Sequence, residues 1–173
     1  TSLRSTIIGR GVTYIGRGAF DNCTGELIVN CNIPASEDEL FGIFQGSKFT
    51  NVTIGNNVTR IGDYAFWNCD SLSSVIIGNN VISIGRGAFQ SCNNLTSLTI
   101  GNRVRFIGNV AFSESNLSKI TIPSSVISIG LGAFGYCDKS AVIYCKSTIP
   151  PKGKDIFFEL TINAKLPNRT IFV

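Results

Sequence analysis

Short segments of alternating apolar and polar residues return at a nearly constant interval along this chain. In the clearest unit, residues 95–112, polar and apolar side chains alternate over 97–100, which is the two-residue period of a half-buried strand. A turn and a second short apolar pair follow, and the unit closes with the compact pair Ala111-Phe112. The same order of elements returns in residues 49–66, 72–89 and 117–134. The pattern therefore predicts one strand-turn-corner unit, repeated along the chain.

A phenylalanine marks the corner of every unit and gives the period of the repeat. The seven copies are Phe20, Phe44, Phe66, Phe89, Phe112, Phe134 and Phe157, separated by 24, 22, 23, 23, 22 and 23 residues. A fixed period of this size is typical of a solenoid, in which stacked coils each contribute one copy of every interior residue. We expect a single domain over residues 1–173, of about seven coils, with mostly short parallel β-strands and turns and little regular helix. Each strand should pair with the strand of the next coil.

Two coils depart from the repeat. We expect an irregular coil at 21–48, because Glu39-Leu40 replaces the usual Ile-Gly pair and a polar stretch precedes it. We expect an atypical closing coil at 138–173, since terminal repeats of a solenoid have one face toward solvent. The chain starts at Thr1 in register with the repeat, so we interpret it as part of a longer protein whose targeting segment lies outside this numbering.

Two sets of glycines recur at fixed places in the coil. The first set follows an interior isoleucine and is predicted to be structural, either through a positive φ or through a close backbone neighbour; it comprises Gly16, Gly62, Gly85, Gly108 and Gly130. The second set comprises Gly55, Gly78 and Gly101 and shares its position with Pro123. Because proline fixes φ near −65°, this second set is predicted to be merely permissive.

Composition excludes several classes of function. Charged residues are 15% of the chain and hydrophobic residues 43%, so the surface is expected to be neutral and polar. The net charge of +4 and the scattered Lys and Arg residues do not predict nucleic-acid binding. No apolar stretch approaches the 18–20 residues of a membrane span. The chain has no histidine, which excludes Ser-His and Cys-His catalysis and leaves no histidine to complete a common zinc ligand set.

Cysteines and carboxylates are the remaining candidates for chemistry. Four cysteines follow the corner phenylalanine by three residues: Cys23, Cys69, Cys92 and Cys137. We interpret them as small buried side chains rather than as a metal site or disulfide staples. The acidic run 37–39 is interpreted as a solvated turn rather than a calcium site, and the repeat places no pair of carboxylates at matched positions. We therefore predict no catalytic residue, no cofactor and no metal.

The repeated element resembles the BspA-type, or Treponema pallidum-type, leucine-rich repeat. The resemblance rests on Ile-Gly-x-x-Ala-Phe-x-x-Cys at 61–69 and 84–92 and on Ile-x-Ile-Pro-x-x-Val at 120–126, and it extends over essentially the whole chain. It implies an α/β-type leucine-rich-repeat solenoid, a curved right-handed superhelix with a parallel sheet on its concave side. It also implies a secreted or surface-anchored protein of an anaerobic bacterium, in a family associated with adhesion and with binding host proteins.

The outward positions of the predicted strands are the candidate binding face. They are Asn51, Thr53, Ser74, Ile76, Ser97, Thr99, Lys119 and Thr121. These side chains are small and mostly uncharged and suit broad contact through hydrogen bonds, although a solvated sheet face would look the same. A second outward row, which includes Tyr14, Arg60, Ile82, Phe106 and Ile127, would form an apolar patch if exposed. Trp67 and Tyr136 could stack on sugar rings, but a packing role is favoured because each is isolated among its equivalents.

Three functions follow in order of preference. The first is a noncatalytic protein-binding or adhesion module of a bacterial cell-surface or secreted protein, with host or bacterial surface proteins or glycans as partners and with no nucleic acid or membrane insertion. The second is a structural spacer in a multidomain surface protein. The third, ranked last, is a carbohydrate-binding protein or a carboxylate-based enzyme. The expected location is extracellular or at the bacterial cell surface.

Overall fold

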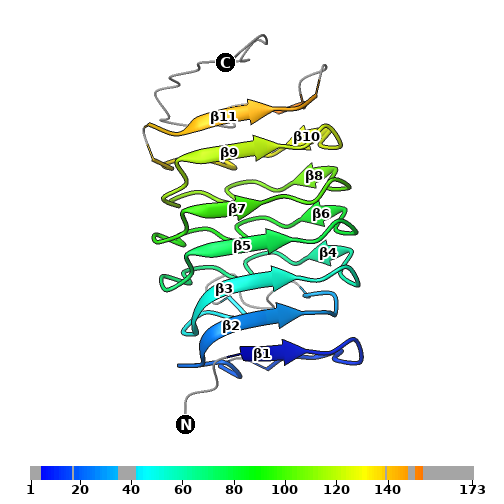
Figure 1. The fold of residues 1–173 in the computed structure, drawn as a ribbon, viewed down its shortest axis with the longest axis vertical. Coiled ribbons are helices and arrows are strands. Elements are labelled where there is room, and N and C mark those ends of the chain that lie inside the picture. Colours follow the sequence, from blue (N-terminus) through cyan, green and yellow to red (C-terminus); the bar gives the residue numbers. More distant parts are fainter. Residues whose placement is uncertain (1–4, 17, 35–41, 139, 148–150, 154–173) are drawn as a thin grey trace.

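The repeating unit folds into a parallel β-solenoid, seen in Figure 1 as a stack of similar coils. The structure, a computed structural model, describes residues 5–16, 18–34, 42–138, 140–147 and 151–153. Within these ranges no residue is helical. The predicted solenoid of short parallel strands is therefore confirmed. Six of the seven corner phenylalanines lie in the described ranges, whereas Phe157, the acidic run 37–39 and most of the predicted closing coil lie outside them.

One strand per coil builds the main wall. Five strands form a continuous sheet in the order β1-β2-β3-β5-β7: β1 (Ser5–Ile8), β2 (Thr24–Val29), β3 (Lys48–Ile54), β5 (Ser74–Ile77) and β7 (Ser97–Thr99). β9 (Lys119–Ile122) and β11 (Val142–Cys145) continue the wall as a separate pair. The expectation that every strand pairs with the next is thus wrong between β7 and β9. The corner before β9, from Phe112 to Leu117, is one residue shorter than the corners of the two preceding coils, Phe66 to Leu72 and Phe89 to Leu95.

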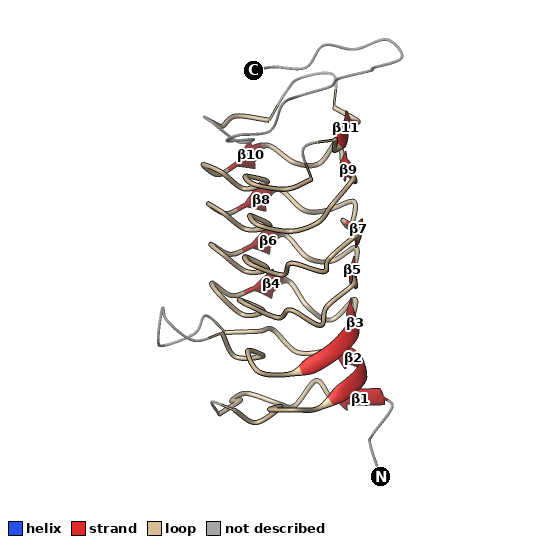
Figure 2. Ribbon diagram, turned by 90° about the vertical axis from the view of Figure 1, so that its left-hand side faces the viewer, coloured by secondary structure: helices blue, strands red, loops and turns tan. Residues whose placement is uncertain are grey.

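A second wall of very short strands lies on the opposite side of the coils, as Figure 2 shows. Its strands are β4 (Arg60–Ile61), β6 (Ser83–Ile84), β8 (Phe106–Ile107) and β10 (Ser128–Ile129), paired in parallel in the order β10-β8-β6-β4. Each comes from the second apolar pair of the repeat and ends in a buried isoleucine. The coil is therefore a flattened loop with a hydrogen-bonded sheet on two sides and an apolar interior between them.

The corner phenylalanines form a continuous stacked column in that interior. Successive rings from Phe44 to Phe134 lie 4.4–5.3 Å apart between centroids, with interplanar angles of 8° or less. Phe20 continues the column at 5.2 Å but tilts by 28° and is only half-buried. The predicted superposition of equivalent corners is confirmed. Burying each ring contributes roughly 1.5–3 kcal/mol of hydrophobic stabilisation.

The corners are also joined by main-chain hydrogen bonds from each coil to the next. In the third coil the amides of Tyr64, Phe66 and Asn68 donate to carbonyl oxygens of the fourth coil at 2.8–2.9 Å. Tyr64 and Asn68 have positive φ angles of 56°, and the equivalent residues of the following coils share this left-handed conformation. These left-handed corner positions accept residues other than glycine, even Val110 (φ 49°), because the hydrogen bonds to the next coil fix the backbone.

In the central coils, glycines of both recurring sets lie where backbones of successive coils nearly touch. A Cβ on Gly108 would lie 2.6 Å from the Arg86 amide nitrogen and the Gly85 carbonyl carbon, so the structural role predicted for the first set is confirmed there. Gly16 differs, because its Cβ would meet only the Tyr14 side chain, at 3.7 Å. A Cβ on Gly78 would lie 2.5 Å from the Ile54 carbonyl oxygen. The prediction that the second set is merely permissive is therefore wrong. Pro123 excluded a left-handed φ at that position but said nothing about the distance to the preceding coil.

Three of the four repeated cysteines are small buried side chains, as predicted. Cys69, Cys92 and Cys137 are buried, whereas Cys23 is half-buried, and all six cysteines are free thiols. The buried thiols donate to the corner carbonyl oxygen one coil back, at 3.2 Å for Cys92 to Phe66. Burial raises the pKa of Cys92 to about 12 and raises that of Cys69 well above its ordinary value. These thiols are therefore protonated and structural.

Candidate binding face

The outward side chains of the main wall form two parallel rows that run along the solenoid. Strand register places Asn51, Ser74 and Ser97 next to one another in the first row. The same register aligns Thr53, Ile76 and Thr99 in the second row. The structure thus brings together six of the eight predicted face residues on adjacent strands. Lys119 and Thr121 lie on β9, beyond the interruption of the sheet.

The two rows also include residues on strands that were not among the predicted face residues. Glu26 and Ser5 continue the first row and Ile28 and Ile7 the second, on β2 and β1. Beyond the interruption, Tyr144 is the partner of Thr121, and the Lys119 ammonium lies 5.3 Å from the centre of its ring. These positions were missed because the first and last coils match the repeat poorly. The period-2 alternation in the strands themselves was the available signal.

The second row has a distinctive chemistry, which we call the β-branched row. From β1 to β7 it consists of Ile7, Ile28, Thr53, Ile76 and Thr99. Ile7 is 66% exposed and Ile76 is 49% exposed. Isoleucine and threonine share a stiff branched shape that packs well on a pleated surface. The row is therefore a rigid strip of alternating methyl and hydroxyl groups with no charge.

The polar groups of this face are available to a partner. Within the described part of the chain, the hydroxyls of Thr53, Ser74, Ser97 and Thr99 make no hydrogen bond to protein. The neighbouring residues at the start of the strands behave differently, since Thr50 and Ser73 donate to carbonyl oxygens of the preceding coil. The strand starts thus hold the coils together, while the two rows keep their hydrogen-bonding capacity.

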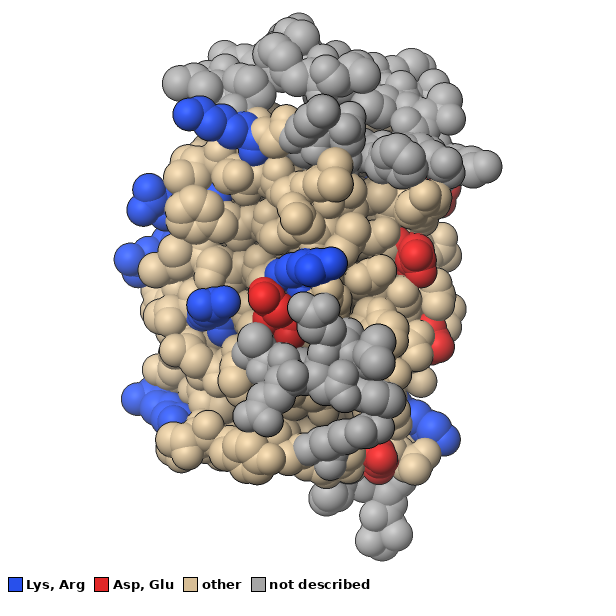
Figure 3. All heavy atoms as spheres, turned by 180° about the vertical axis from the view of Figure 1, so that it is seen from behind, with Lys and Arg blue, Asp and Glu red and all other residues tan. Residues whose placement is uncertain are grey.

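The second outward row lies on the opposite wall and is exposed, as its pattern suggested. Ile82, Phe106 and Ile127 are solvent-exposed on or beside the short strands, and Phe106 is 44% exposed. The Arg105 guanidinium lies 5.6 Å from the centre of the Phe106 ring. Figure 3, which views this wall, shows basic groups mainly along one edge and acidic groups mainly along the other, with a basic and an acidic group also near the centre. No continuous basic track of the kind that follows a phosphate backbone is visible there.

The described residues provide no metal centre and no membrane span. Among them, no three His, Cys, Asp or Glu side chains are grouped so that they could hold a metal ion. The search for a helix long and apolar enough to cross a bilayer also found none in the residues that the structure describes. What the main wall offers a partner is therefore its shape and its hydrogen-bonding groups.

A family model and solved structures match this chain. The model of the BspA type leucine rich repeat region matches in six copies, over residues 1–42 and 41–163. A leucine-rich repeat protein from Bacteroides ovatus is 28% identical, superposes with a TM-score of 0.57 and aligns over 82% of this chain. One from Eubacterium ventriosum is 23% identical, with a TM-score of 0.53 over 67% of this chain. A search of the curated proteins gave no match.

The aligned regions are pieces of longer proteins. The match covers 33% of the Bacteroides ovatus chain and 37% of the Eubacterium ventriosum chain. The chain thus spans about a third of the length of these solved structures. They share the fold of this chain, and their remaining length lies outside the comparison.

Proposed function

The chain belongs to the BspA-type leucine-rich repeat family, and from this premise we propose that it is a noncatalytic binding module of a bacterial cell-surface or secreted protein. The family and the absence of histidine support a binding role over catalysis. Repeats of this family are typical of surface-associated bacterial proteins, which supports a location outside the cell. The proposed partner is a protein surface, from the host or from another bacterium.

The observation that carries the proposal is the β-branched row beside the row of small polar residues. A solenoid binds through extended contact along its regular surface rather than through one pocket. Exposed Ile7 and Ile76 provide apolar area, and the unbonded hydroxyls of Thr53 and Thr99 provide hydrogen bonds. Because the backbone is held on both sides by neighbouring coils, little conformational entropy is lost when a partner binds.

The alternative function, a structural spacer, is distinguished by mutation of the face. The double variant Ser97→Lys, Thr99→Lys places two charges at the centre of the rows and should abolish attachment to the partner. Its control, Asn57→Lys, Ser124→Lys, adds the same charge at two exposed turn positions outside the rows. Attachment is measured on a panel of immobilised extracellular matrix proteins, with circular dichroism to confirm folding. A spacer would show no saturable attachment, or attachment that both double variants retain equally.

A further inference from the structure

A depression, which we call the notch, lies beside a shorter corner of the solenoid. In two coils the next buried leucine follows the corner phenylalanine by six positions, Leu72 after Phe66 and Leu95 after Phe89. Leu117 follows Phe112 by five positions. The shorter coil lies between two longer neighbours, and a depression of about 510 Å³ opens there.

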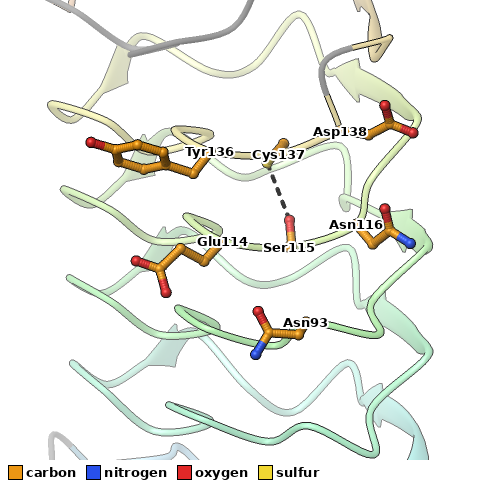
Figure 4. A pocket seen from close by; sticks show the side chains of 7 residues that line it. All are labelled: Asn93, Glu114, Ser115, Asn116, Tyr136, Cys137 and Asp138. Atoms are coloured by element: carbon orange, nitrogen blue, oxygen red, sulfur yellow. Dashed lines mark hydrogen bonds between the residues drawn. The ribbon is translucent and has the colours of Figure 1, made fainter.

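The walls of the notch come from three successive coils, as Figure 4 shows. Glu114 and Tyr136 lie on one side and Asn116 and Asp138 on the other, with Asn93 at the lower end. Glu114 and Tyr136 occupy the same left-handed position of successive coils, with φ angles of 59° and 54°. The floor is formed by buried Ser115 and Cys137, whose Oγ and Sγ atoms lie 3.2 Å apart.

Tyr136 presents an aromatic surface at this notch. It is 51% exposed, so about half of this side chain faces solvent. Its backbone is in the left-handed conformation, with a φ of 54°. A half-exposed tyrosine combines an apolar ring with a polar tip and suits a ligand that has both kinds of surface.

The other lining groups are positioned hydrogen-bonding side chains. Glu114 is fixed by the Ser91 hydroxyl, which donates to its Oε2 at 2.8 Å, and its other oxygen remains available. Asn93 donates from Nδ2 to Asp70 at 2.8 Å, which leaves its carbonyl oxygen as an acceptor. Asn116 makes no side-chain hydrogen bond within the described residues. The notch therefore offers acceptors from three coils, with an exposed ring on one side and an amide donor on the other.

The charge of the notch limits the ligand. None of its described lining residues is Lys or Arg, and both Glu114 and Asp138 are acidic, so anions are repelled. Hydrogen bonds from the Ser140 amide and hydroxyl to Asp138 lower the pKa of this carboxyl group. A glycosidase acid requires a raised pKa, so Asp138 does not suit that role.

We propose that this notch binds a neutral sugar residue of a glycan, with the sugar ring against Tyr136 and its hydroxyls donating to Glu114 and Asn93; Figure 4 shows Tyr136 and Glu114 on the same side of the notch. A sugar presents a face of C–H groups and a rim of hydroxyl donors, and hydrogen bonds from hydroxyls to carboxylates are stronger than neutral ones. A shallow polar depression does not suit an apolar ligand, which needs an enclosed apolar pocket. This site is separate from the face proposed to bind protein.

The test is an NMR titration of the folded chain with methyl β-D-galactopyranoside, methyl β-D-glucopyranoside and N-acetyl-D-glucosamine. At least one sugar should cause saturable shifts at the side-chain amides of Asn93 and Asn116, with a dissociation constant in the millimolar range expected of a shallow site. Tyr136→Ala should weaken binding at least tenfold, and Glu114→Gln should weaken it severalfold. Tyr14→Ala, at a tyrosine that is 74% exposed in the first coil, should leave it unchanged.

A second variant tests the shape of the site. Insertion of one asparagine between Asn116 and Leu117 gives this corner the six-position spacing of the two preceding coils. It should remove sugar binding while Tyr136 is still present. Sugar shifts that survive Tyr136→Ala, or the absence of saturable shifts with all three sugars, would overturn the proposal. Saturable shifts with calcium chloride or lysine methyl ester in place of the sugars would also overturn it, in favour of a cation site. The Ser97→Lys, Thr99→Lys variant should bind sugar normally, so the two proposals can fail separately.

Discussion

The thiol of Cys92 donates to the carbonyl oxygen of Phe66, one coil back, with 3.2 Å between sulfur and oxygen. The same relationship joins Cys69 to Phe44 and Cys137 to Phe112. A thiol is small enough to be buried beside the phenylalanine column and still provides a weak donor. The cysteine of the repeat is thus a link between coils.

This relationship predicts how stability depends on alkaline pH. Burial raises the pKa of Cys92 from 9.0 to about 12 in the folded state, whereas the unfolded thiol keeps its ordinary value. Below pH 9 both states are protonated, so the free energy of unfolding does not depend on this group. Between pH 9 and 12 only the unfolded state loses the proton, so the free energy of unfolding falls by about 1.4 kcal/mol for each pH unit. Urea unfolding measured from pH 7 to 11 tests this.

The variant Cys92→Ala provides the control for the pH dependence. It should be less stable at pH 7 but should show a smaller decline above pH 9, because one of the buried thiols is missing. Labelling with iodoacetamide at pH 8 should modify the half-buried Cys23 and Cys145 first. Rapid modification of Cys92 in the folded protein would contradict the structural role.

Removing one ring from the phenylalanine column should be strongly destabilising. Phe89 is fully buried, and its centroid lies 4.9 Å from that of Phe66 and 5.3 Å from that of Phe112. Phe89→Ala should lower the free energy of unfolding by about 3–5 kcal/mol, because it leaves a cavity between two rings. Phe106→Ala, at the exposed phenylalanine of the next coil, should cost under about 1 kcal/mol. Equal losses in chemical denaturation would show that the column is not the core.

Replacing Val110 with glycine should stabilise the protein. A β-branched residue is strained at the φ of 49° that Val110 adopts, and equivalent positions carry Gly87 and Gly132, with φ of 56° and 59°. Val110→Gly should raise the free energy of unfolding by about 1 kcal/mol and raise the midpoint of thermal unfolding. The reverse change, Gly87→Val, should destabilise, since a Cβ there would lie 2.6 Å from the Tyr64 ring. A less stable Val110→Gly would mean that its side-chain packing outweighs the strain.

Adding a methyl group between coils should be costly at one glycine and harmless at another. Gly108→Ala places its Cβ against the backbone of the preceding coil, which cannot move without breaking the ladder. We expect a loss of about 1–3 kcal/mol in the free energy of unfolding. Gly11→Ala, with no atom within 4 Å of its Cβ, should change stability by less than about 0.5 kcal/mol. The comparison is made by thermal unfolding under identical conditions.

The period, the stacked column and the parallel strands could be predicted from the sequence alone, because every coil repeats the same burial pattern and neighbouring coils must superpose. Phe66, Phe89 and Phe112 could be placed over one another from their spacing alone. The register of the outward rows followed in the same way for Ser74 with Ser97 and Ile76 with Thr99.

Features that depend on the distances between coils could be known only from the folded structure. Gly78 looked replaceable beside Pro123, yet the preceding carbonyl oxygen leaves no room for a Cβ. The two carboxylates Glu114 and Asp138 lie 24 residues apart and do not share a repeat position, so no sequence pattern pairs them. Both line one depression, beside the corner between Phe112 and Leu117. The repeat predicts the structure that all coils have in common. The effect of a local change in one coil depends on its contacts with the coils before and after it, which only the folded structure shows.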